Sequence, residues 1–193
     1  GVRDGRMEFT TFFDTATDAE HDALKTLPTS DRVMSYFRGA TLGNPAASMV
    51  AKQVNYDFER GDDGSLVATV EAESNGFGLS WGVMLTAGKR TDGSATNGSS
   101  VDFGTGSLAF GLQAYLHVFS FTGTSVTVKL QESSDDGSGD AFVDITGGAF
   151  TAATGGTSQR IATASGQTVE RYIRAVTTGT FSSAVFAVNV IRN

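Results

Sequence analysis

Cysteine is absent from this 193-residue chain, which excludes a disulfide framework and thiolate-ligated zinc. Histidine is scarce: His21 and His117 are far apart and have no Cys, His or Glu at metal-ligand spacing nearby, so both are interpreted as structural or surface residues. No run of about 18 apolar residues exists, and no membrane-spanning segment is expected. These absences disfavour a metalloenzyme, a disulfide scaffold and a membrane protein.

Charge is also scarce, and it is unbalanced. Charged residues make up 18% of the chain, below the roughly 25% of typical domains. The formal net charge of −7 disfavours a protein that grips nucleic-acid phosphates, because such binding needs clustered Lys and Arg. An acidic surface is still compatible with DNA that slides past it without being bound.

Glycine, in contrast, is abundant at 24 residues, and Thr and Ser fill much of the remainder. Thr suits strands, whereas Gly and Ser suit turns, so the composition favours a mainly β fold. Period-two alternation supports this: Leu66, Ala68 and Val70 alternate with more polar residues. The predicted strands lie at about 6–13, 33–37, 48–56, 66–72, 77–85, 112–121, 126–131, 141–145, 169–176 and 184–191.

One short helix is predicted over Asp18–Leu27. Thr17 and Glu20 have the spacing of a capping box, which satisfies free amides at a helix start, and Pro28 ends the pattern. The sequence thus predicts three parts: a β-barrel or sandwich with this packed helix in residues 1–90, a polar linker or loop in 91–107, and an immunoglobulin-like β-sandwich in 108–193.

Several short patterns resemble catalytic or binding motifs but lack their context. Gly104-x-Gly106-x-x-Ala109 matches a dinucleotide fingerprint, yet a strand rather than a helix is predicted after it. Asp136, Ser138 and Asp140 alternate as Ca²⁺ ligands can, but an exposed acidic hairpin loop explains them more simply. The pairs Asp62-Asp63 and Asp135-Asp136 lie in glycine-rich turns, where carboxylates are normally solvated. No catalytic, cofactor-binding or metal-ligating residue is assigned, and the chain is not expected to be an enzyme.

Aromatic residues give a second candidate class. Trp81, Tyr36, Tyr56 and Phe77 are available for a sugar-binding platform, although aromatic residues in strands more often pack in a core. Arg171, Tyr172 and Arg174 form a basic-aromatic group on a strand. It is interpreted as a packed tyrosine whose arginine neighbours pair with acids.

The first half resembles tail tube proteins of long-tailed bacteriophages. The resemblance lies in DGRMEFTTFFD (4–14), SYFRGATLGNPAASMVAKQVNYD (35–57) and NGFGLSWGVMLTAGKR (75–90). The second half, with YLHVFSFTGTSVTVKLQESSDDGSGDAFVDITGG (115–148), is similar to immunoglobulin-like or carbohydrate-module-like domains on phage virion proteins. No motif in either half is a catalytic signature.

The resemblance implies a structural virion protein, assembled in the bacterial host cytoplasm. It implies hexameric rings of this chain that stack into a tube beside other tail proteins, with DNA passing through the lumen unbound. The alternative is a capsid or tail decoration protein, or a carbohydrate-binding module for the host surface. No cofactor or membrane partner is expected.

Overall fold

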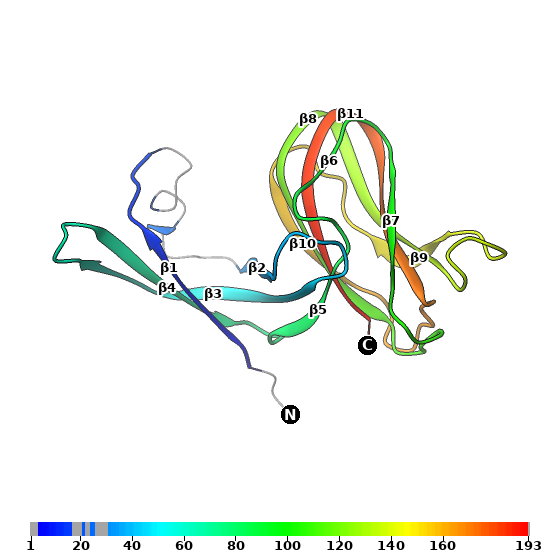
Figure 1. Ribbon diagram of the computed structural model, residues 1–193, viewed down its shortest axis with the longest axis horizontal. Helices are drawn as coiled ribbons and strands as arrows, with labels where there is room; N and C mark the ends of the chain where they lie inside the picture. Colours follow the sequence, from blue (N-terminus) through cyan, green and yellow to red (C-terminus); the bar gives the residue numbers. More distant parts are fainter. Residues whose placement is uncertain (1–3, 17–20, 22–23, 26–30, 193) are drawn as a thin grey trace. The chain divides into compact units, whose positions relative to one another are not determined.

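The computed structural model describes residues 4–16, 21, 24–25 and 31–192, and the protein is mainly β. The described strands form one large antiparallel sheet, with principal order β1-β4-β3-β5-β11-β8-β10 (Figure 1). Their bounds are β1 Arg6–Phe12, β2 Arg32–Phe37, β3 Pro45–Arg60, β4 Leu66–Ser74, β5 Ser80–Met84, β6 Arg90–Asp92, β7 Asn97–Asp102, β8 Leu112–Ser133, β9 Val143–Ala149, β10 Thr157–Ala162 and β11 Tyr172–Arg192.

The helix expected over Asp18–Leu27 is not among the elements of the described residues. Most of that segment lies outside them. Within its described part, the Lys25 amide donates one helix-type hydrogen bond to the His21 carbonyl, 2.8 Å away. His21 and Leu24, two of the described residues of this segment, have α-helical backbone.

Contacts group the chain into two units, one of residues 1–34 and 49–79, the other of residues 35–48 and 80–193. The first contains β1, β4 and β3 from Met49 onward, which pair antiparallel in the order β1-β4-β3. The turn predicted between β3 and β4 is present: the Gly64 amide donates to the Gly61 carbonyl, and the Ser65 amide donates to the Asp63 carboxylate. This carboxylate lies in solvent, and its hydrogen bonds with Ser65 lower the pKa of Asp63.

The second unit is organised around two long strands, β8 and β11, which pair over nearly their whole length (Figure 1). The sequence predicted four short strands here, at about 112–121, 126–131, 169–176 and 184–191. Gly123 and Gly179 lie between them. Both glycines have positive φ, and a Cβ on Gly123 would lie 2.4 Å from the Cα of Phe181. The glycines therefore let each strand bend and continue rather than end.

The bend gives this unit a single core. Leu116 and Val118, before the bend in β8, belong to the same buried cluster as Val126 and Val128 after it. In β11, Phe186, Val188 and Val190 are buried as their alternation predicted. The two halves of the β8–β11 ribbon thus bury their apolar faces in common.

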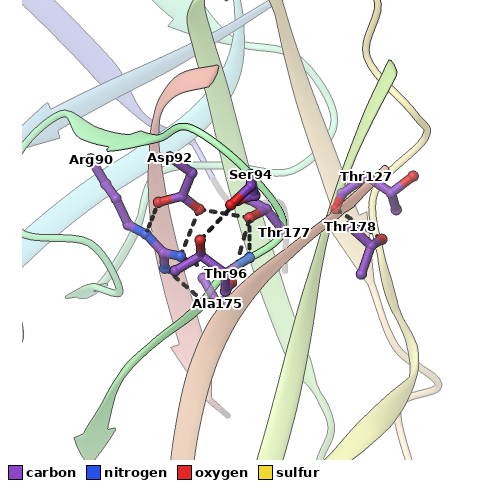
Figure 2. Close-up of polar contacts among 8 residues, drawn as sticks. All are labelled: Arg90, Asp92, Ser94, Thr96, Thr127, Ala175, Thr177 and Thr178. Carbon is purple, nitrogen blue, oxygen red and sulfur yellow. Dashed lines mark hydrogen bonds and ion pairs between the residues drawn. The ribbon is translucent and has the colours of Figure 1, made fainter. Parts of the chain in front are cut away.

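The segment 91–107, expected as a polar linker or loop, carries β6 and β7, which both pair with β11. A buried ion pair explains why so polar a segment is ordered (Figure 2). The Arg90 guanidinium donates to both carboxylate oxygens of Asp92 at 2.8 and 2.7 Å, and also to the carbonyls of Ala175 and Thr96. Thr177 of β11 donates to the same carboxylate at 2.7 Å. Hydrogen bonds of polar side chains, rather than apolar packing, thus hold this segment against β11.

Candidate functional site

The β1-β4-β3 ribbon of the first unit has two chemically different faces. Cross-strand pairs place Met7, Phe9 and Thr11 of β1 beside Ala72, Val70 and Ala68 of β4. Tyr56 and Phe58 of β3 continue this row on the same side. Ala68, Val70 and Ala72 of the central strand are buried, whereas Phe9 and Phe58 on the flanking strands are 41% and 47% exposed, so this face is apolar and only partly covered.

The opposite face is acidic. Its carboxylates outnumber its cations five to two: Glu8, Asp57, Glu59, Glu71 and Glu73 against Arg6 and Lys52. Arg6 lies within 2.6 Å of Glu8 and 2.9 Å of Glu71, which confirms that these three side chains share one side of the ribbon. An anionic polymer near this face would be repelled rather than held.

The outer edge of β1 is open, since β1 pairs only with β4 among the described strands. At the two ends of this pairing, Ser74 donates to Gly5 and Phe13 donates to Leu66. Antiparallel ladders alternate, so the backbone groups of Met7, Phe9 and Thr11 face β4. Those of Arg6, Glu8, Thr10 and Phe12 face outward. Phe12 is also 73% exposed, so this edge presents outward-facing backbone groups and an aromatic ring.

Two of the four aromatic residues considered for sugar binding lie together. Tyr36 and Trp81 are 54% and 59% exposed, and their rings meet edge to face with centroids 6.4 Å apart. Ala47 of β3 is the cross-strand partner of Trp81. Tyr56 and Phe77 belong to the other unit, where Tyr56 contacts His21 and Phe58.

The acidic loop 133–140 uses its carboxylates on itself. Asp135 accepts hydrogen bonds from the amides of Ser138, Gly139 and Asp140 at 3.0, 2.6 and 3.1 Å, and these bonds, led by that from Asp140, lower the pKa of Asp135. Asp136 accepts a hydrogen bond from Ser100. No group of three or more His, Cys, Asp or Glu within the described ranges is arranged to hold a metal ion.

The remaining sequence candidates are held by local contacts. Arg171 donates hydrogen bonds to both oxygens of Asp102, and this pairing lowers the pKa of Asp102 to about 2. Arg174 donates a hydrogen bond to Gln131 and lies over the ring of Phe142. The motif Gly104-x-Gly106-x-x-Ala109 follows β7, and no described helix begins after it. It therefore has no helix N-terminus that could face a pyrophosphate.

Two hollows of the second unit have walls without a histidine or a carboxylate. One, of about 680 Å³, is formed mainly by small residues 151–157 with Gln159 and Arg160. The other, of about 290 Å³, is lined by Leu42, Leu85–Ala87, Arg90 and 97–99. Neither brings together an acid and a base.

His117 has polar partners that the sequence did not predict. It is half-buried in β8, and each ring nitrogen has a serine hydroxyl as partner: Nδ1 lies 2.9 Å from Ser158 and Nε2 lies 2.8 Å from Ser35. His21 lies in the first unit, 3.1 Å from the Tyr56 hydroxyl. No spacing rule links residues 35, 117 and 158, so only the fold could bring them together.

The sequence matches no protein-family model, no curated protein and no solved structure. The part of the chain that the structure describes contains no helix with the length and apolar character needed to cross a bilayer.

Proposed function

We propose that this chain is a structural virion protein of a bacteriophage tail, whose copies form rings that stack into a tube for DNA passage. The observation that carries the proposal is the β1-β4-β3 ribbon, with its open edge and its acidic face. An open edge is a hazard for a monomer, but it is an interface for a protein that assembles by strand addition.

The acidic face gives the proposal its electrostatic support. DNA must pass through a tail lumen without being retained, and a wall richer in carboxylates than in cations holds no phosphate backbone. In this proposal the ribbon face with Glu8, Asp57, Glu59, Glu71 and Glu73 lines the lumen. Hexameric ring closure through heterologous contacts, followed by stacking against neighbouring rings and tail proteins, is the symmetry that such edges favour.

The second unit fits an outer, immunoglobulin-like domain. Its bent β8–β11 ribbon buries both halves in one core, which supports a β-sandwich. In the assembled tail this sandwich would face solvent.

Electron microscopy of the purified chain at several concentrations tests the proposal. The wild type is expected to form rings or striated tubes. Thr10→Pro removes an outward-facing amide of β1 but no hydrogen bond to β4, so it is expected to prevent assembly while the fold remains. Thr10→Val keeps the amide and is the matched control. Small monodisperse particles of the wild type at every concentration would refute the proposal.

The exposed Tyr36–Trp81 pair favours a second candidate, a virion decoration module that binds host-surface carbohydrate. Sugars stack their C–H faces on exposed aromatic rings, and both rings are more than half exposed. A glycan array comparing the wild type with Trp81→Ala tests this candidate, which requires binding that is lost in the variant.

A further inference from the structure

A chain of polar side chains crosses the second unit between two layers. Residues 35–48 include the end of β2 and the start of β3, and two of their serines, Ser35 and Ser48, bond to side chains of β8 and β11. The Asn189 amide nitrogen lies 2.8 Å from the Ser48 hydroxyl. The Ser48 hydroxyl lies 2.6 Å from the Ser35 hydroxyl. The Ser35 hydroxyl lies 2.8 Å from His117 Nε2. Ser48 and Asn189 are 0% exposed.

Donor and acceptor chemistry sets the direction of each hydrogen bond in this row of side chains. The Asn189 nitrogen can only donate, so Ser48 accepts from it and passes its single proton to Ser35. Ser35 then directs its proton to His117 Nε2. Because Nε2 accepts, neutral His117 carries its proton on Nδ1 and donates it to Ser158, 2.9 Å away.

We propose that these hydrogen bonds from Asn189 to Ser158 form an acid-sensitive latch. The latch holds residues 35–48 against β8 and β11 while His117 is neutral, and it releases them when Nε2 is protonated. A proton on Nε2 makes it a donor, so Ser35 must turn and accept. Ser48 can still donate to the second lone pair of Ser35, so the proton of Ser35, which is half-buried, is the one that loses its acceptor among these side chains.

The surroundings of His117 also oppose a charged imidazole. The side chains next to it from β2 and β11 are uncharged: Ser35, Phe37 and Ala187. Ser48 and Asn189, which continue the hydrogen bonds beyond Ser35, are uncharged as well. The carboxylates of β3, Asp57 and Glu59, belong to the first unit, and the charged groups that contact the neighbours of His117 in β8, Tyr115 and Phe119, are cations. Arg160 of β10 is bonded to Tyr115, and Lys89 lies over the ring of Phe119, which stacks on His117.

The sign of the pH dependence follows from burial, which lowers the pKa of His117 from 6.5 to about 4. The closed latch is therefore favoured fully above pH 6.5, and this advantage is lost as the pH falls toward 4, because the released state binds the proton more readily. Between pH 7.5 and pH 4.5 the opening equilibrium is expected to rise roughly 70-fold.

Trp81 is a built-in probe, because it is the single tryptophan and contacts Tyr36 of β2. Its emission would be followed from pH 7.5 to 4.5, together with hydrogen exchange of residues 35–48 corrected for intrinsic rates. The two histidines allow a matched pair of variants. The transition is expected in the wild type and in His21→Gln, and it is expected to disappear in His117→Gln.

A transition that persists in His117→Gln, or a wild type with no transition down to pH 4.5, would overturn the proposal. Nitrogen NMR of the wild type at pH 7.5 adds a test that needs no variant. The proposal requires the Nδ1–H tautomer of His117, and the Nε2–H tautomer would refute it.

Discussion

Replacing Asp92 with Asn should destabilise the protein strongly, because it leaves the Arg90 side chain, which is only 14% exposed, without a counter-charge. Asp92 is 4% exposed and accepts hydrogen bonds from Arg90 and Thr177. An Asn amide would also direct N–H groups toward the donors of Arg90. Removing one partner of a buried pair costs about 3–5 kcal/mol, so the free energy of unfolding should fall by that amount.

Asp102→Asn is the matched control for this experiment. Asp102 also receives two hydrogen bonds from an arginine, Arg171, but both side chains are well exposed, at 42% and 38%. Water solvates the arginine that remains, so the loss should be a small fraction of that in Asp92→Asn. Urea unfolding of both variants at pH 7 measures the difference. Equal losses would show that burial of the Arg90–Asp92 pair does not set its energetic role.

The bend and the acidic loop give two further predictions. Gly179→Ala should lower the free energy of unfolding by at least about 2 kcal/mol more than Gly64→Ala. A Cβ on Gly179 would lie 2.3 Å from the Ser125 carbonyl oxygen, whereas a Cβ on Gly64 meets nothing within 4 Å. Thermal unfolding compares the two variants, and similar losses of stability would contradict the predicted clash. Asp135→Asn should speed limited proteolysis within 133–140 several-fold, because the amides of residues 138–140 lose their charged acceptor, and Asp136→Asn should change the rate much less.

Local alternation predicted most strands correctly but misplaced where they end. The alternation Val126, Val128, Leu130 correctly marks a half-buried strand, and Phe186, Val188 and Val190 face the core as expected. The four short strands predicted in β8 and β11 are in fact two long ones, which bend at Gly123 and Gly179, where φ is positive. The strand Thr157–Ala162 was missed, since TSQRIA has only a weak apolar alternation.

Interactions between distant residues were beyond the reach of the sequence. The polar segment 91–107 was expected to be a linker, and the partners that order it, Ala175 and Thr177, lie more than 80 positions along the chain from Arg90 and Asp92. The hydroxyl partners of His117 are similarly remote. The sequence predicted the two faces of β1 from its alternation. It did not predict the pairing of β1 with β4, which extends these faces into the acidic and apolar faces of the ribbon.

The hydrogen bond between Ser48 and Asn189 spans 141 positions. A ribosome emits the strand with Ser48 long before the strand that completes its surroundings, and contacts this distant form slowly. The hydrogen bond from Asn189 to Ser48 must therefore wait for nearly the whole chain, while β3 can pair with β4 and β5 soon after their synthesis. The order of synthesis thus favours early formation of the β3–β4 hairpin, before the last strand gives the second unit its final form.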